Sequence, residues 1–204
     1  MLETMTNEFA DQHDLNYVTY IKTNVPVIIY PYNPLWPCLY EKEKEIIKRT
    51  AGPCLLSIEH IGSTSVPGLM SKDIIDIMAG VADKTAAEEC QKLLLSAGYD
   101  NVKDLDHPEW FYRLGKRLSG AYCHLHIVKE NSEHQRKHID FRDWLCNHPE
   151  DAKAYEQIKI DLAKKYRNDR LGYTNAKCDF IERILEKCMM HYSVAIVASR
   201  RPDA

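Results

Sequence analysis

The chain has 204 residues, which is the length of one domain or of one domain with an appended helical part. Hydrophobic residues make up 45% of it and charged residues 28%, so it can bury a core and extensive disorder is not expected. The 27 basic and 30 acidic residues give a formal net charge of −3, which provides no general attraction to nucleic acid or to an anionic membrane. Any phosphate must therefore be held by a local site, and nucleic acid is not an expected partner.

The sequence also gives no sign of secretion or membrane insertion. No apolar run approaches the roughly 18 residues that span a bilayer, and the N-terminus lacks the basic and apolar regions of a signal peptide. The seven cysteines are scattered without a C-x-x-C pair, which is typical of reduced thiols, and we expect a cytoplasmic protein. Cys123 stands beside His124, but neighbouring residues on a strand point to opposite faces, so we expect a buried and unreactive thiol.

The first two thirds of the chain predict a mixture of strands and helices after an extension of about 20 polar residues. β-Branched and aromatic runs indicate the strands, and Pro and Gly indicate the turns. In chain order the predicted elements are a strand at 25–30, a turn at 31–37, a helix at 40–50, strands at 55–61 and 74–81, a helix at 83–97 closed by Gly98, and strands at 110–114 and 121–128 joined by a turn at 115–120.

The remainder predicts three charged, amphipathic helices at 132–147, 149–166 and 175–191, broken at His148-Pro149 and Leu171-Gly172. The fold class we expect is therefore α+β, a mixed sheet with flanking helices and a C-terminal helical part. The domain organisation that follows is an extension at 1–20, one domain at 21–191 whose sheet part ends near 130 and whose helical part covers 131–191, and a tail at 192–204.

A loop and an acid within residues 59–76 form the first candidate site. Gly62, Ser63 and Thr64 follow a predicted strand and offer backbone N–H groups and hydroxyls, as loops that hold phosphate do, although a plain tight turn has the same composition. Asp76 lies inside the apolar run 74–78, where a buried carboxylate is costly unless it is paired or bound to metal. The alternative for Asp76 is a capping or ion-paired position at the end of the strand.

Two histidines form the second candidate site. His124 and His126 are two apart in the predicted strand 121–128 and so share a face, while Leu125 and Ile127 point to the other. Two adjacent imidazoles can bind one divalent metal or contact a phosphate, and the alternative is a solvated strand face. His134 and His138 have the i, i+4 spacing of a metal pair on a helix, but their charged neighbours favour a solvated face.

Further polar residues are candidates for binding an anion, each with the alternative of an ordinary surface charge. Arg142 stands out because apolar residues flank it. The candidates are Lys72, Arg113, Lys116, Arg117, Arg142 and Lys177.

Several of these segments together resemble the GrpB family. The resemblance runs in order from about residue 25 to residue 184, and its GST-x-VPGL block is highly specific. It implies a fold of the nucleotidyltransferase superfamily, and the fusion of such domains to dephospho-CoA kinase in some bacterial proteins implies nucleotide or coenzyme metabolism. The segments that carry it are residues 30–37, 58–69, 72–77, 124–128 and 141–145.

The superfamily's motif, as the resemblance implies it, is only partly present. It has a Gly-Ser after one strand, two carboxylates at i and i+2 on the next strand and a third on a later strand, which hold two Mg²⁺ ions. Asp76 matches the first carboxylate, but Met78 takes the place of the second, and His124 or His126 stands near the third. Asp73, three positions from Asp76, falls on the other strand face and does not restore the motif.

Replacing carboxylates by imidazoles shifts the expected metal from Mg²⁺ toward Zn²⁺, Mn²⁺, Ni²⁺ or Fe²⁺. The cofactor we expect is a divalent metal, Mg²⁺, Mn²⁺ or Zn²⁺, held by Asp76, His124 and His126, or none. These three residues are the predicted catalytic set, and the predicted phosphate-binding set is Gly62, Ser63, Thr64, Lys72, Arg142 and Lys177, with Glu59, His60 and Arg113 as further candidates.

Three functions fit this pattern. The first is an enzyme that transfers a nucleotidyl or phosphoryl group to a small-molecule acceptor, and it is the one we favour. The second is a protein that binds a nucleotide or another small phosphorylated ligand without turnover, which the missing second carboxylate favours. The third is a metal-dependent hydrolase in which Glu59 or His60 serves as base or fourth ligand.

Overall fold

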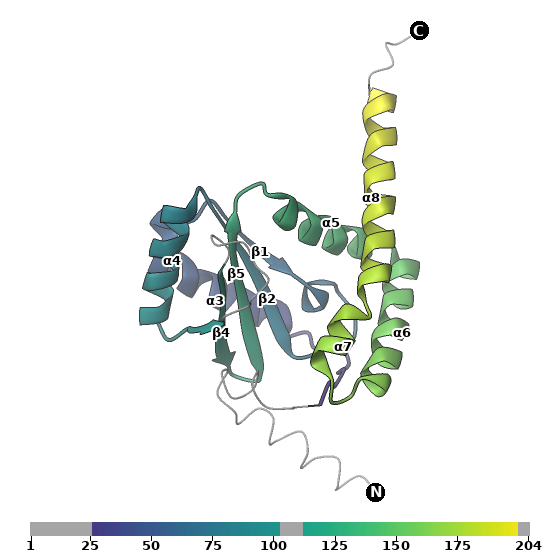
Figure 1. The fold of residues 1–204 in the computed structure, drawn as a ribbon, viewed down its shortest axis with the longest axis horizontal. Coiled ribbons are helices and arrows are strands. Elements are labelled where there is room, and N and C mark those ends of the chain that lie inside the picture. Colours follow the sequence, from purple (N-terminus) through teal and green to yellow (C-terminus); the bar gives the residue numbers. More distant parts are fainter. Residues whose placement is uncertain (1–25, 103–111, 200–204) are drawn as a thin grey trace, which may run out of the picture.

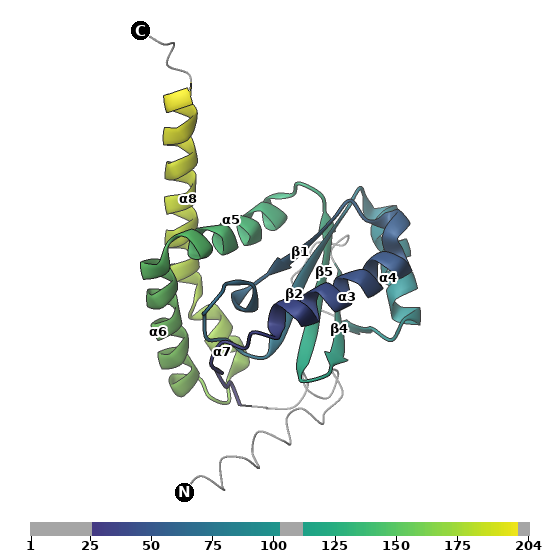
Figure 2. The same cartoon turned by 180° about the vertical axis from the view of Figure 1, so that it is seen from behind.

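A computed structural model of the chain describes residues 26–102 and 112–199, with side chains as far as residue 192. A five-stranded sheet is covered on one face by helices α3 and α4 and on the other by α5 to α8 (Figures 1 and 2). The strands are β1 (Ser57–Ile61), β2 (Ile74–Val81), β3 (Asp100–Val102), β4 (Tyr112–Leu118) and β5 (Ala121–Lys129). The helices are α3 (Trp36–Ala51), α4 (Lys84–Ser96), α5 (Glu133–Asn147), α6 (Pro149–Lys165), α7 (Arg170–Asn175) and α8 (Cys178–Ser199), with short 3-10 turns at Gly52–Cys54 and Ser63–Ser65.

The sheet is mixed, with the strand order β1-β2-β5-β4-β3. Strands β2 and β5 are paired in parallel at its centre, and the other described pairs are antiparallel. The parallel register places Asp76 opposite His124 and Met78 opposite His126. The predicted α+β fold, with a mixed sheet, flanking helices and a C-terminal helical part, is confirmed.

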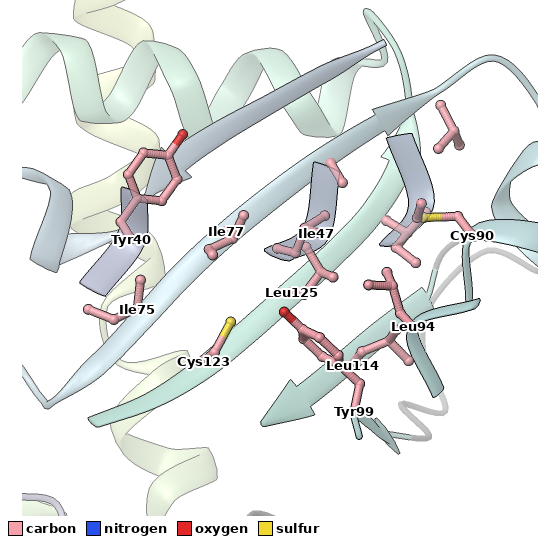
Figure 3. Packing of buried hydrophobic residues seen from close by; sticks show 14 of the residues in the cluster. Tyr40, Ile47, Ile75, Ile77, Cys90, Leu94, Tyr99, Leu114, Cys123 and Leu125 are labelled. Carbon is pink, nitrogen blue, oxygen red and sulfur yellow. The ribbon is translucent and has the colours of Figure 1, made fainter. Parts of the chain in front are cut away.

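The central strands are buried on both faces, as their nearly continuous apolar sequence predicts. Ile75 and Ile77 of β2 and Cys123 and Leu125 of β5 pack with α3 and α4 in the main hydrophobic core (Figure 3). Burial raises the pKa of the Cys123 thiol well above its ordinary value, because the thiolate would lose its hydration. The expected burial of Cys123 is confirmed, and the seven cysteines are all free thiols.

Helix α4 shows the local signals that define its ends. Its N-cap Asp83 accepts a hydrogen bond from the backbone N–H of Ala86, at 2.9 Å. Gly98 follows the last turn with φ +87°, a left-handed conformation that glycine adopts without steric cost. The predicted helix 83–97 is therefore confirmed to within one residue at each end.

A second hydrophobic core joins the C-terminal helices to the loop that precedes β2. Val66 and Leu69 of that loop pack with Leu145 of α5, Tyr155 of α6 and Phe180 of α8. The loop and the helices are thereby fixed relative to one another, and the helices stand over the face of the sheet that carries Asp76. Beyond this contact, α8 projects away from the rest of the molecule (Figure 1).

Several predicted boundaries were wrong. Within 26–30 there is no strand, only one bridge between Tyr30 and Ser71, because the chain there meets a loop instead of a sheet edge. Helix α3 begins at Trp36, since Pro37 in its first turn is compatible with helix geometry. The turn between β4 and β5 is shorter than predicted, because Gly115 is paired with His124 inside the sheet.

At the helical end, the third predicted helix, 175–191, corresponds to α8, which begins at Cys178 and continues to Ser199. The break predicted at Leu171-Gly172 was wrong, because both residues lie inside the short helix α7. The short strand β3 was not predicted, because three residues carry no periodicity. The predicted extension 1–20 and the start of the predicted strand 110–114 lie outside the described residues. Within the described part of the chain, no helix is both long and apolar enough to cross a membrane.

The main core yields a stability prediction. Leu125 on β5 is completely buried, so Leu125→Ala should lower the free energy of unfolding by about 2–5 kcal/mol through lost burial and the cavity left behind. Leu56→Ala is the matched control, because Leu56 is 62% exposed and its truncation should change stability by less than about 0.5 kcal/mol. Urea denaturation of both variants measures the difference, and equal losses would contradict the described core.

Candidate functional site

Three of the predicted site residues lie together on the sheet face beneath α5 to α8. Asp76 and His124 are directly opposite each other in the parallel pair β2–β5, and His126 is two positions farther along β5. Nδ1 of His124 is 3.2 Å from Oδ1 of Asp76, and Nε2 of His126 is 3.8 Å from the same oxygen. One ligand atom from each residue lies within 4.8 Å of the other two.

The protonation of this group follows from its burial and its contacts. Burial alone would raise the pKa of Asp76, but hydrogen bonds from His124 and His126 outweigh it and hold that pKa far below its usual range. Burial lowers the pKa of His124 and lowers that of His126 to about 4, despite the opposing effect of Asp76. At neutral pH the group is therefore one carboxylate with two neutral imidazoles.

Gly62 and Ser63 approach Asp76 from the end of β1. Gly62 has φ +72°, and a Cβ added to it would lie 2.5 Å from Oδ2 of Asp76. Glycine is therefore required at position 62 for two reasons: the backbone is left-handed, and a side chain would clash with the carboxylate of Asp76. Ser63, the next residue, opens the 3-10 turn Ser63–Ser65 and lines the same cavity as Asp76.

The cavity above Asp76 has a volume of about 420 Å³ and lies between the sheet and the C-terminal helices. Among the described residues that line it, Asp76 is the only acid, whereas five residues are basic. A cavity with this excess of positive charge favours an anionic ligand. The basic residues are Lys72, Arg113, Lys137, Lys159 and Lys177.

Three of these lysines are grouped around two tyrosines. The ammonium groups of Lys72 and Lys177 lie 5.3 and 4.5 Å from the ring centroid of Tyr173, and that of Lys159 lies 4.9 Å from the Tyr155 ring. Burial and the charge of Lys177 lower the pKa of Lys72 to about 7, and the same causes lower that of Lys159 to about 7. Burial also lowers the pKa of Lys177. An anion bound among them would stabilise their charged forms.

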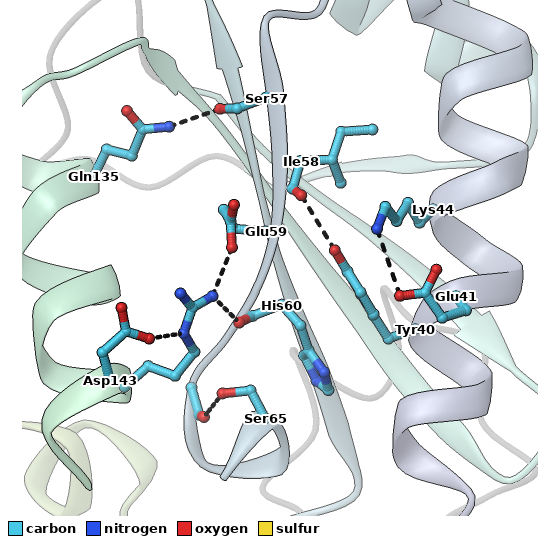
Figure 4. A network of polar contacts seen from close by, with 12 residues as sticks. Tyr40, Glu41, Lys44, Ser57, Ile58, Glu59, His60, Ser65, Gln135 and Asp143 are labelled. Carbon is cyan, nitrogen blue, oxygen red and sulfur yellow. Dashed lines mark hydrogen bonds and ion pairs between the residues drawn. The ribbon is translucent and has the colours of Figure 1, made fainter. Parts of the chain in front are cut away.

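Six predicted candidates do not line this cavity: Glu59, His60, Thr64, Lys116, Arg142 and Arg117, the last of which is exposed on β4. Thr64 is buried, donates a hydrogen bond to the carbonyl of Ile74 at 2.9 Å and lies 3.1 Å from Nε2 of His60. His60 points to the opposite face of the sheet, where its ring stacks on Tyr40 at 4.6 Å (Figure 4). Burial lowers the pKa of His60 to about 4. His60 is therefore placed to support β1 against α3.

Glu59 and Arg142 pair with each other at the edge strand β1. Nη1 of Arg142 donates to Oε2 of Glu59 at 2.7 Å and to the backbone carbonyl of His60 at 2.9 Å, and Nε donates to Asp143 at 2.7 Å (Figure 4). The partial burial expected of Arg142 is present, but its donors are engaged with protein acceptors. The structure gives neither Glu59 nor His60 a position from which to complete the Asp76 group.

Two other charged residues also lie outside the cavity: Lys116 on the opposite face of the sheet, and Asp73 in the segment before β2. Nζ of Lys116 lies 2.7 Å from Oε1 of Glu43, in the layer of α3 and α4. Asp73 precedes β2 and accepts a hydrogen bond from Nε1 of Trp36 at 3.0 Å. Neither belongs to the cavity lining, in keeping with the expectation that Asp73 does not restore the carboxylate pair.

The helices add site residues that sequence reasoning missed. Tyr155 and Lys159 come from α6, Tyr173 from α7 and His138 from α5. Lys159 is 2% exposed and donates a hydrogen bond to the carbonyl of Met70. His138 was expected on a solvated face, and this was wrong, because α5 packs over the sheet and turns His138 into the cavity. Its spacing from His134 was the one sequence signal that could have indicated it.

The donor set fits a single divalent metal better than a pair of Mg²⁺ ions. Two neutral imidazoles and one carboxylate suit Zn²⁺, Mn²⁺, Fe²⁺ or Ni²⁺, and three protein ligands leave positions for a ligand or water. Met78, which replaces the second carboxylate, is fully buried against Ile61 and Val128. A second metal ion therefore has no carboxylate at that position to hold it.

Similarity to known proteins shows which family the chain belongs to. The fold is an α+β domain with a pocket, lined mainly by basic residues among its charged groups, between the sheet and the helices. The GrpB protein family matches residues 26–187, and a glutamate-rich protein GrpB from Alkalihalophilus pseudofirmus is 34% identical over 165 residues, covering 79% of this chain and 95% of that protein. The chain belongs to the GrpB family.

A solved structure and a more distant relative extend this comparison. The crystal structure of the conserved protein GrpB from Enterococcus faecalis matches with a TM-score of 0.72 and 29% identity, covering 81% of this chain and 99% of that one. A dephospho-CoA kinase from Mycobacterium bovis is 26% identical over 176 residues, covering 74% of this chain but only 43% of that protein. The first match shows the same fold over nearly the whole of a GrpB protein.

The buried Lys159 yields a pH prediction. Its pKa falls from an ordinary 10.5 to about 7 in the folded chain, so between these values the unfolded chain binds more protons and stability should rise with pH. Lys159→Met should remove this gain, which amounts to at most about 1.4 kcal/mol per pH unit. The measurement is urea denaturation at pH 7 and pH 9.5 on wild type, Lys159→Met and the control Lys153→Met, whose lysine is exposed on the same helix. Identical pH slopes in all three proteins would refute this account of Lys159.

Proposed function

We propose that the protein is a metal-dependent enzyme that transfers a nucleotidyl or phosphoryl group from a small phosphorylated donor to a small-molecule acceptor, with water able to replace the acceptor. The observation that carries this proposal is the convergence of Asp76, His124 and His126 in a cavity whose other charged lining residues are basic. Metal ligands beside a cationic pocket are what a phosphate ester needs for binding and reaction.

In this proposal the residues divide into two groups. Asp76, His124 and His126 hold the divalent metal, which would act as a Lewis acid toward a phosphoryl oxygen. Lys72, Lys159 and Lys177 neutralise the remaining phosphate charge. Ser63, which also lines the cavity, adds a hydroxyl that can hydrogen-bond to the phosphate. Because the lysines are largely desolvated, their attraction for a phosphate is stronger than it would be at the surface.

Two further observations support a phosphorylated ligand. The order of features, a Gly-Ser loop after β1 and an acid on the neighbouring β2, is the one that the nucleotidyltransferase superfamily uses, with Gly62 in direct proximity to Asp76. The relative from Mycobacterium bovis is by name a dephospho-CoA kinase, although this chain covers less than half of it.

A second candidate function is binding of the same ligand without turnover. The observation that favours it is the fully buried Met78 at the position of the second carboxylate, since two-metal transfer enzymes require that ligand. Both candidates place the ligand in the same cavity. They differ in whether a phosphorus–oxygen bond is broken when ligand and Mn²⁺ are supplied together.

Replacement of the metal-binding carboxylate tests the proposal directly. Asp76→Asn should weaken binding of Mn²⁺ or Zn²⁺ by more than about 100-fold, because it removes an ionic ligand, and it should abolish turnover of nucleoside triphosphates. Asp73→Asn is the matched control, since Asp73 lies outside the cavity lining and Asn can still accept the Trp36 hydrogen bond. Calorimetric titration with metal and ³¹P NMR of the nucleotides are the measurements.

If the wild type and Asp76→Asn bind Mn²⁺ and Zn²⁺ with equal affinity, Asp76 is not a metal ligand and the proposed metal site is wrong. If metal and nucleoside triphosphates bind to the wild type but no product forms on prolonged incubation, the binding function replaces the enzymatic one.

Gly62 gives an independent test of the same geometry. Gly62→Ala and Gly68→Ala should each lose about 1–2 kcal/mol of stability, because both positions have positive φ. Only Gly62→Ala should also weaken metal binding, by about tenfold or more, since its Cβ would displace Asp76, whereas a Cβ at Gly68 meets nothing within 4 Å. Equal metal affinities in the two variants, at comparable stability, would show that Asp76 does not bind the metal.

A further inference from the structure

His138 enters the cavity from the side opposite the sheet. It lies on α5, lines the cavity with Asp76, and its ring centroid is 6.3 Å from that of His126. It is not one of the three residues whose donor atoms converge within 4.8 Å. It therefore faces the metal-binding group without belonging to it, and the function proposed above gives it no role.

The hydrogen bond that His138 makes fixes where its proton lies. Its Nδ1 is 2.9 Å from the backbone carbonyl oxygen of His134, one helical turn earlier. A carbonyl oxygen only accepts hydrogen bonds, so Nδ1 carries the hydrogen and donates it. In the neutral ring the other nitrogen, Nε2, then has a lone pair and accepts.

The surroundings make such an acceptor distinctive. In their charged forms the basic residues that line the cavity offer only donors, and Oδ1 of Asp76 lies 3.2 Å from Nδ1 of His124 and 3.8 Å from Nε2 of His126. Nε2 of His138 is thus a nitrogen acceptor beside, but separate from, the proposed metal ligands. The bond to His134 also fixes the ring orientation, which is the arrangement that a general base needs.

We propose that His138 is the general base of the reaction, an inference that rests on the proposed enzymatic function. In the step, the O–H bond of the attacking hydroxyl or water breaks and its proton passes to Nε2 of His138. The oxygen uses the freed electron pair to form a bond to phosphorus, and the bond from phosphorus to the leaving-group oxygen breaks with its electron pair remaining on that oxygen. His138 becomes an imidazolium and then returns its proton to solvent.

The chain offers a variant that removes only the acceptor. Asparagine places an N–H near the position of Nδ1, so His138→Asn retains a donor to the His134 carbonyl but has no counterpart of Nε2. His148→Asn is the matched control, because Nδ1 of His148 makes the same kind of bond, at 2.9 Å to the carbonyl of Trp144, on a residue that does not line the cavity.

The experiment measures hydrolysis of bis(4-nitrophenyl) phosphate and of the four common nucleoside triphosphates by the full chain with Mn²⁺, together with Mn²⁺ affinity. His138→Asn should lower kcat by about 100-fold or more, the usual contribution of a general base, with Mn²⁺ affinity unchanged. Added imidazole should restore part of the rate. His148→Asn should match the wild type, and Asp76→Asn provides the background rate.

Each contrary result has a definite meaning. If His138→Asn retains turnover within about threefold of the wild type, the base role is wrong while the enzymatic function stands. If His138→Asn loses Mn²⁺ binding, His138 is a metal ligand and the base role is again wrong. If the wild type turns over none of the probes above the Asp76→Asn background, the enzymatic function fails and the base role fails with it.

Discussion

The parallel pairing of β2 with β5 is the constraint on which the site depends. Side chains alternate along each strand, so this register alone decides that Asp76 and His124 face each other and that His126 follows on the same side. A shift of β5 by one residue would turn His124 and His126 toward the core beneath α3 and α4 and separate them from Asp76. The apolar residues between them, Ile77 and Leu125, hold the register because they are fully buried in that core (Figure 3).

The C-terminal helices turn this sheet face into an enclosed site. Together with the segment before β2, they surround it with lysines whose charges are costly to bury, since burial and mutual repulsion lower the pKa values of Lys72 and Lys159 to about 7. A chain selected only for stability would place apolar residues there. Under the proposed function, the ligand supplies the negative charge that these lysines around an ionised Asp76 lack, and the gain in binding offsets the loss in stability.

The sequence was sufficient for the parts of the site that local rules govern. Alternation along the strand placed His124 and His126 on one face, and the cost of a buried carboxylate singled out Asp76. Local rules could not show which helix faces the sheet, so His138 was assigned to solvent and Lys159 was not noticed. They also could not show that Arg142 would be engaged by Glu59. These outcomes depend on how α5 and α6 pack on the sheet, which is a tertiary property.

The fold could likewise be predicted where local signals are strong. Strongly apolar or well-capped elements such as β2 and α4 were predicted closely, while short or loop-bound segments were not.

The central claim, that Asp76, His124 and His126 bind a metal beneath a phosphate pocket, is tested most directly by crystals grown with Mn²⁺ and pyrophosphate. Anomalous diffraction should show one Mn²⁺ peak at coordination distance from all three residues, with pyrophosphate density among the lysines. A fully bound pyrophosphate with no anomalous peak at these residues would contradict it.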